Sequence, residues 1–299
     1  MESLAAGGHR RQGRGQPVSS GFPQTLQFSF ADSINRLVDW LVLNYGDHLR
    51  SLSDQLLQLL VGLENLLRLL PWWLLLLLVG LLAWHASRSL LRSAVLVALL
   101  ALIGMLGLWD KLLQTLALVL VSTGLCVLVG VPLGILLAAR PLARRLLLPV
   151  LDVMQTLPAF VYLIPVLMLF GLGKVPAVFA TLIYALPPLV RLTELGLSQI
   201  DPSLLQAAHG LGASRWQRLR RIALPLALPS IMAGLNQSVM MALSMVVVAS
   251  MIGARGLGED VLAGIQTLNV GQGMEAGLAI VALAMVIDRI SQAYGRSSR

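Results

Sequence analysis

Charged side chains are scarce in this sequence. Asp, Glu, Lys and Arg make up 12% of its 299 residues, whereas about a quarter of a typical soluble domain is charged. Apolar residues make up 57%, and the mean hydropathy is +0.81. This balance argues against a set of soluble domains and indicates one compact bundle of helices in a lipid bilayer.

Lysine and cysteine are also rare. The only lysines are Lys111 and Lys174, and Lys174 is followed by Val175 rather than by Ser or Thr. Without a GK[ST] phosphate loop, the chain has no expected nucleotide site. The lone Cys126 lies in an apolar run, can form no intrachain disulfide, and is expected to be a small packing residue. The sequence predicts no catalytic residue, no metal ligand and no cofactor on this chain.

The charges that are present are mostly arginines, and they give a net charge of +8 and a pI of about 10.7. Such a charge can indicate nucleic-acid binding. Here, however, the arginines gather in short segments between apolar runs, as topology signals do. Nucleic acid is therefore not an expected partner, and the positive-inside rule places the arginine clusters in the cytoplasm. The clusters are Arg88/Arg92, Arg140/Arg144/Arg145, Arg215/Arg218/Arg220/Arg221 and Arg289/Arg296/Arg299.

Seven segments approach the length of about 20 mostly apolar residues that a membrane span requires. They cover residues 69–86, 93–109, 112–139, 146–171, 176–195, 226–251 and 276–290. The predicted fold class is all-α, a polytopic membrane bundle of about seven transmembrane helices. Prolines inside these spans would kink the helices, which is typical of helices that surround a pathway and also of irregular packing. These prolines are Pro132, Pro158, Pro165, Pro187 and Pro188.

The N-terminal region has a different pattern. Residues 1–27 are predicted to be a disordered tail. Residues 28–68 are amphipathic and are expected to lie on membrane lipid with Trp40 and Tyr45 as anchors, or to bind a soluble partner. With two accessory spans in residues 69–109 and a core in residues 110–295, the N-terminus is periplasmic and the C-terminus cytoplasmic. If either accessory helix fails to span, the N-terminus is cytoplasmic and the core is unchanged.

A basic loop, residues 197–225, separates the fifth and sixth predicted spans. Asp201 and Pro202 are typical of a helix start, as an N-cap acceptor followed by a first-turn proline. Gly212 is expected to end that helix, and Ser214 can cap a second one. A helix–glycine–helix element can be bound in a groove and can pass its movement to the flanking spans. An amphipathic loop that rests on the membrane is the alternative.

The spacing within this loop resembles the EAA loop of binding-protein-dependent ABC importer permeases. Most members have Glu at the first motif position, where this chain has Gln206. Residues 147–176 and 232–268 look like the permease subunit of glycine betaine/proline and choline uptake systems, and the likeness is strongest from residue 112 to 295. The resemblance implies the type-1 ABC importer permease fold and the bacterial inner membrane. The matching positions are Gln206, Ala207, Ala208, Gly212, Ile222, Leu224 and Pro225.

The resemblance also implies a transport subunit that is not itself an enzyme. In the family, two permease copies associate with two cytoplasmic ATPase subunits, which bind ATP and Mg, and an external binding protein delivers the ligand. The implied cargo is a quaternary ammonium compound or compatible solute: glycine betaine, choline or proline. Another small ligand, such as an amino acid, is an alternative. An ion-coupled secondary carrier is a further alternative, which the coupling-loop motif and the scarcity of mid-membrane carboxylates disfavour.

Polar residues inside the spans are candidates for the translocation pathway, because polar groups in a membrane usually face a cavity or a partner. Aromatic rings nearby could attract a cationic ligand, although ordinary packing explains each ring equally well. The candidate set is Gln155, Pro158, Phe160, Tyr162, Asn236, Gln237 and Ser244.

Three further expectations concern the ends of the spans. Asp152 is expected to hydrogen-bond to Thr156, one helical turn away, and Asp288 to pair with Arg289. The glycine-rich residues 253–273 should contain a short helix at 259–268. That segment could be an outer gate, a docking surface or a solvated loop.

Overall fold

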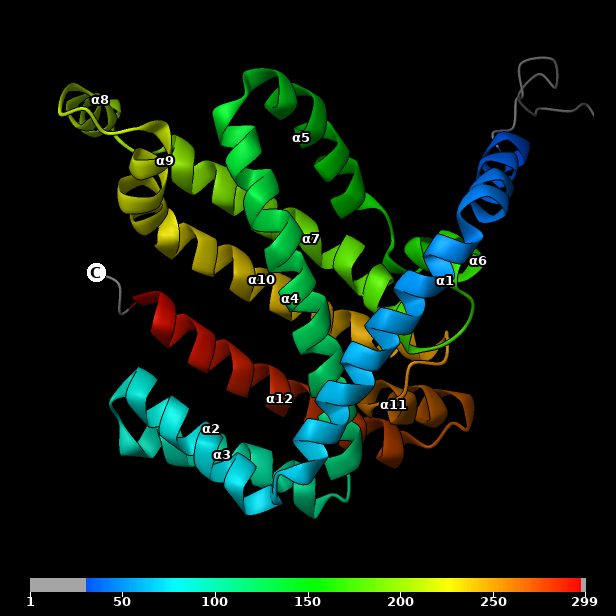
Figure 1. The fold of residues 1–299 in the computed structure, drawn as a ribbon. Coiled ribbons are helices and arrows are strands. Elements are labelled where there is room, and N and C mark those ends of the chain that lie inside the picture. Colours follow the sequence, from blue (N-terminus) through cyan, green and yellow to red (C-terminus); the bar gives the residue numbers. More distant parts are fainter. Residues whose placement is uncertain (1–30, 297–299) are drawn as a thin grey trace, which may run out of the picture.

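The computed structural model describes residues 31–296, and every regular element in that range is helical (Figure 1). The predicted tail at residues 1–27 lies outside the described residues. The elements in chain order are α1 (Ala31–Leu69), α2 (Trp72–Ser87), α3 (Leu90–Met105), α4 (Trp109–Ala139), α5 (Pro141–Thr156), η2 (Ala159–Tyr162), α6 (Leu163–Phe170), α7 (Lys174–Ser198), α8 (Pro202–Gly210), α9 (Arg215–Arg218), η3 (Leu219–Ala223), α10 (Leu224–Ser250), α11 (Leu257–Gln266) and α12 (Val270–Arg296).

The predicted helix bundle is confirmed. Within the described range, four helices are individually long and apolar enough to cross a membrane: Trp109–Ala139, Lys174–Ser198, Arg215–Ser250 and Val270–Gln292. Two more candidates are bent pairs, α1 with α2 at 98° and α5 with α6 at 112°, and α3 is a shorter apolar helix. All seven predicted segments thus contain helix. Membrane crossing by α2, α3 and the α5–α6 pair stays a prediction.

Residues 146–171 do not form the single kinked span that the sequence suggested. Pro158 follows α5, and proline disfavours the helical conformation of the residue before it. Leu157 is accordingly extended, with ψ 135°. The Tyr162 hydroxyl donates a hydrogen bond to the Met154 carbonyl, which ties η2 back onto α5. The proline therefore produces a sharp bend of 112° between two separate helices.

Helices α4, α7 and α10 pack closely through glycine. A Cβ atom added to Gly134 of α4 would lie 2.6 Å from Cβ of Thr193 on α7, and one added to Gly196 of α7 would lie 2.6 Å from Cβ of Ser230 on α10. Small residues let helix backbones approach in this way in membrane proteins. The three helices form the tightly packed centre of the bundle.

Helix α1 lies against one end of this centre. Leu60 is buried with Leu118, in the third turn of α4, and with Val175, the second residue of α7. Nζ of Lys174, at the start of α7, contacts the two carboxylate oxygens of Glu64 at 2.6 and 2.7 Å. The loop of residues 197–225 follows the other end of α7. Helix α1 and this loop are therefore at opposite ends of the bundle.

The segment of residues 253–273 contains α11, which confirms the predicted short helix. Leu257 is fully buried, and its N–H donates to Oγ1 of Thr115 on α4 at 2.8 Å. Lys111 of α4 pairs with Asp260 at 2.5 Å. The first part of the segment is therefore fixed to the first turns of α4 and is not a solvated loop, whereas residues 265–271 are exposed.

Candidate coupling site

The loop between α7 and α10 begins with a capped helix, α8. Oδ1 of Asp201 accepts a hydrogen bond from the Ser203 N–H at 2.8 Å, and Pro202 occupies the first turn. Hydrogen bonding from Ser203 lowers the pKa of Asp201 below its ordinary value, because it favours the charged form of the carboxyl. The cap is therefore ionised at neutral pH. The predicted helix start is confirmed.

A left-handed turn ends α8 where the sequence predicted it. Gly212 has φ +81°, a conformation that costs other L-residues energy, and its N–H donates to the His209 carbonyl at 2.9 Å. Ser214 and Gln217 then form a reciprocal capping box at 2.8 and 3.2 Å. The predicted second helix start is confirmed.

The second helix of the loop does not end before the next span. After α9 the chain enters the π-helical turn η3 and continues directly into α10. The following Pro225 has no N–H, and in a regular α-helix its ring would collide with the Arg221 carbonyl. A widened turn relieves that collision. The loop is thus one free helix, α8, and a rigid extension of α10, rather than two separate short helices.

Helix α8 projects away from the helix bundle and lies beside α9 (Figure 1). The first two motif residues, Gln206 and Ala207, are exposed, whereas Ala208 is buried. Leu204 and Leu211 leave 50% and 89% of their surface exposed. The apolar face formed by these two leucines, which are two helical turns apart, is therefore uncovered within the described chain. A short helix with such a face is suited to binding in a groove.

Two ion pairs connect α5 to the part of α7 that leads into α8. Nε of Arg144 on α5 lies 3.1 Å from Oε1 of Glu194 on α7. The Ser198 hydroxyl, on the last residue of α7, donates to the same oxygen at 2.7 Å. The sequence interpretation did not single out Glu194, although a glutamate three residues after an arginine inside an apolar span was an available signal.

The second ion pair joins Asp152 of α5 to Arg191 of α7. The expected bond between Asp152 and Thr156 is wrong, because the Thr156 hydroxyl donates to the Val153 carbonyl at 3.0 Å. Local spacing suggested the first bond, and an arginine from another helix provides a stronger, charged partner for the carboxylate.

Two of the pathway candidates have partners within the bundle. Tyr162 is buried and lies 6.4 Å, between ring centroids, from Tyr184. Nδ2 of Asn236 donates to Asp288 of α12 at 2.7 Å. Asp288 also accepts from Gln292 at 2.7 Å, and within the described chain these bonds replace the ion pair expected with Arg289.

The other five candidates lie on the outer surface of the single chain. The Ser244 hydroxyl donates to the Met240 carbonyl one turn earlier at 3.0 Å. The surface of α5 near Gln155 is apolar, because Val150 and Val153 are 51% and 56% exposed. The structure therefore does not enclose a pathway within one copy. The five exposed candidates are Gln155, Pro158, Phe160, Gln237 and Ser244.

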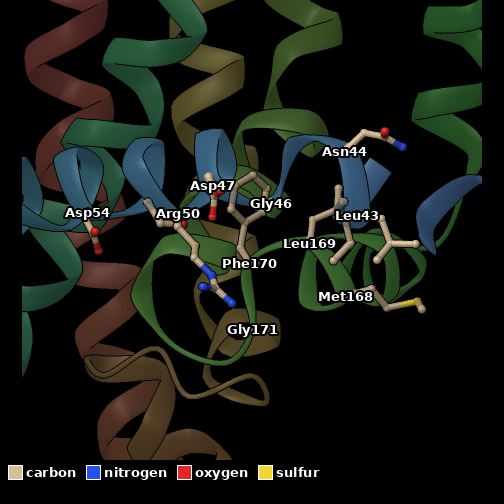
Figure 2. Close-up of a pocket in the computed structure, with 12 residues that line it drawn as sticks. Leu43, Asn44, Gly46, Asp47, Arg50, Asp54, Met168, Leu169, Phe170 and Gly171 are labelled. Carbon is tan, nitrogen blue, oxygen red and sulfur yellow. The ribbon is translucent and has the colours of Figure 1, made fainter. Parts of the chain in front are cut away.

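A pocket of about 680 Å³ lies between α1 and α6, away from these candidates. Figure 2 shows Arg50 of α1 extending toward the turn at Gly171, with Asp47 and Asp54 on the same helix. The opposite wall is formed by residues 168–171. None of the pathway candidates lines this pocket. Among residues 31–296, no three His, Cys, Asp or Glu side chains are grouped to hold a metal ion.

Comparison with known proteins places this geometry in a family. The family model described as binding-protein-dependent transport system inner membrane component matches residues 130–295, over half of the chain. The chain belongs to this family. The matched range contains α8, α9 and the spans on either side of them, so the predicted permease identity is confirmed.

Two relatives of this permease align over most of its length. The glycine betaine/proline betaine transport system permease protein ProW of Escherichia coli (strain K12) is 46% identical over 262 residues, covering 88% of this chain and 74% of ProW. The glycine betaine transport system permease protein OpuAB of Bacillus subtilis (strain 168) is 44% identical over 262 residues, covering 88% of this chain and 93% of OpuAB.

The fold of the permease is also that of a solved transporter. A chain of the MetNI methionine ABC transporter, in an inward-facing crystal form, aligns with a TM-score of 0.56 and 23% identity. The alignment covers 62% of this chain and 93% of that chain. At this identity the likeness shows the fold alone, and it confirms the predicted ABC importer permease fold.

Proposed function

We propose that this permease, as a pair of copies, moves a quaternary ammonium compound or compatible solute inward, with ATP hydrolysed by separate subunits. Glycine betaine is the leading cargo, with choline and proline as the other candidates, because the names of ProW and OpuAB specify glycine betaine transport. ATP and Mg would bind to a cytoplasmic ATPase. An external substrate-binding protein would deliver the cargo, in keeping with the name of the family.

The observation that carries the proposal is the free helix α8. It presents an uncovered apolar face and is joined to α7 by only three residues. A groove on an ATPase would cover this face and move the helix as a rigid body. Because Gln206 is neutral, docking would rest on apolar contact and hydrogen bonds rather than on an ion pair. The same feature has no use in an ion-coupled carrier that works alone.

The arrangement of charges supports one orientation. The arginine clusters after α4 and around α9 would lie in the cytoplasm under the positive-inside rule. Helix α1 would then lie at the periplasmic end. Trp40 and Tyr45 are half exposed and pack edge to face at 5.8 Å, which suits anchors in the headgroup region. This orientation places the N-terminus in the periplasm and gives α2 and α3 one crossing each.

The exposed polar candidates support pairing of two copies. Gln155 and Gln237 lie on outer surfaces of α5 and α10. Polar side chains are costly when they face lipid. A second copy related by two-fold symmetry would cover the same surface on both subunits. The pathway would then form between the copies, with these residues along it.

The test is uptake by proteoliposomes that contain the permease, its ATPase and its binding protein. Labelled glycine betaine, choline and proline are supplied in turn, each in competition with the other two. We expect ATP-dependent uptake, with glycine betaine the strongest competitor. Uptake that proceeds without ATP and follows an ion gradient would refute the proposal.

A further inference from the structure

Helix α5 is held to the bundle in a different way from α4, α7 and α10. Its outer face is open, with 71% of Leu142 and 64% of Leu146 exposed. On the inner face, Leu151 is buried in a small cluster with Leu137 of α4 and Val190 of α7. The two ion pairs to α7 supplement this small cluster. Helix α5 thus depends on charge for its attachment more than its neighbours do.

The two ion pairs differ in burial, and this difference indicates which of them is the stronger. The Glu194 side chain is 5% exposed, so its charge requires a partner inside the protein. Arg144 is 49% exposed and could reach water if it were released. Asp152 and Arg191 are 59% and 34% exposed, so solvent weakens their attraction. The Arg144–Glu194 pair is the stronger of the two connections.

The order of the charges along the two helices also favours one register of α5 on α7. Along α5, arginine comes before aspartate, and along α7, arginine comes before glutamate. Each positive group meets a negative group because the helices run in opposite directions. A slide of α5 along α7 would separate both pairs at once. The pairs therefore favour a single register between the two helices.

Each of these two helices is connected to an element with a role in the proposed transport: α7 to α8, and α5 to α6. Three residues join α8 to Ser198, the last residue of α7, whose hydroxyl is bonded to Glu194. Helix α5 carries Gln155 and leads through Pro158 into η2 and α6. Movement of α8 can therefore reach the bent α5–α6 span if α5 follows α7.

We infer that the Arg144–Glu194 pair, supported by Asp152–Arg191, is a latch that makes α5 move with α7 when α8 moves. These four are positioning residues, which act on the pathway through the helices that carry them. The inference rests on the proposed function and deepens it. It assigns to the bent α5–α6 span the role of responding to ATP hydrolysis.

The test exchanges the charges of the stronger pair. The variants are Arg144→Glu, Glu194→Arg and the double exchange, with Arg145→Glu as the matched control. Arg145 is exposed and has no ion pair within the described residues. Uptake of labelled glycine betaine and ATP hydrolysis are measured in the same proteoliposomes. The result is expressed as solute transported per ATP hydrolysed.

We expect each single reversal to lower the transport ratio about tenfold, within the range found for coupling networks. The double exchange should restore the ratio to within about twofold of the wild type. The control should leave it unchanged. Single variants with the wild-type ratio would overturn the latch, as would a double exchange that fails to restore it. A parallel loss of uptake and hydrolysis at a constant ratio would show a structural role only and would also overturn it.

If a reversed charge prevents assembly of the complex, variants with an uncharged side chain provide a second test. Arg144→Gln leaves the buried Glu194 carboxylate without its arginine, whereas Glu194→Gln frees an arginine that can reach water. Arg144→Gln should therefore lower the transport ratio more than Glu194→Gln does. Equal reductions of the ratio in the two variants, or a larger reduction in Glu194→Gln, would overturn the latch. A wild-type complex without ATP-dependent uptake would instead refute the proposed function.

Discussion

Replacing Lys174 with methionine tests how α1 is held on the bundle. Nζ of Lys174 contacts both oxygens of Glu64 at 2.6 and 2.7 Å, and the side chains are 21% and 7% exposed. Lys174→Met leaves the Glu64 carboxylate buried without its partner. Removing one member of a buried ion pair costs about 3 kcal/mol, the lower end of the usual range, because Lys174 is partly exposed.

The lost free energy should weaken the docking of α1 on the bundle, because the ion pair joins α1 to the first turn of α7. At 1.4 kcal/mol for each tenfold change, about 3 kcal/mol raises the undocked fraction about 100-fold. Hydrogen exchange of the backbone amides near Leu60, measured by mass spectrometry in lipid nanodiscs, reports that fraction. We expect exchange about 100-fold faster in Lys174→Met than in the wild type.

Two controls separate the ion pair from general damage. The double variant Glu64→Leu/Lys174→Met replaces the pair with apolar side chains and should exchange nearly as slowly as the wild type. Lys111→Met breaks the other lysine ion pair, to Asp260, and should leave exchange in α1 unchanged. Wild-type exchange in Lys174→Met would refute this account of α1. Fast exchange in the double variant would refute it as well.

Three further predictions concern the loop, the bundle and the pathway. Gly212→Leu forces a large side chain into the left-handed region at φ +81°, so it should abolish transport-coupled ATP hydrolysis and leave membrane insertion intact. Gly210→Ala is its control, and normal coupled hydrolysis in Gly212→Leu would contradict the prediction. Gly258→Ala places a Cβ 2.4 Å from a backbone oxygen of α10 and should lower the thermal midpoint, at a cost of about 1–3 kcal/mol, while Gly277→Ala meets open space and should not. Gln155→Leu should lose uptake in an assembled complex, and wild-type uptake would remove that residue from the pathway.

The parts of the coupling site that depend on local chemistry could be predicted from the sequence. Asp201 caps α8 through a residue two positions away, and Ser214 and Gln217 cap α9 within one turn. Gly212 supplies the left-handed turn at the expected place. Each of these features is determined by neighbours in the chain, so motif spacing was sufficient to find them.

The features that depend on distant residues could not be predicted in the same way. Glu64 and Lys174 are 110 residues apart, and the sequence analysis considered Lys174 only in excluding a phosphate loop. The pairing of Arg144 with Glu194 requires knowledge of how α5 sits on α7. The bend at Pro158 was expected only as a kink, because a single proline does not determine whether the helix continues.

Photo-crosslinking from α8 tests the central claim most directly, namely that this helix docks on an ATPase. A photo-reactive amino acid replaces Leu211, which is 89% exposed on the uncovered face of the loop. The matched control replaces Leu172, which is 79% exposed and lies between α6 and α7, at the end of α7 opposite the loop. We expect a covalent adduct with the ATPase subunit from position 211 and none from position 172. An assembled, transport-active complex without that adduct would contradict the account.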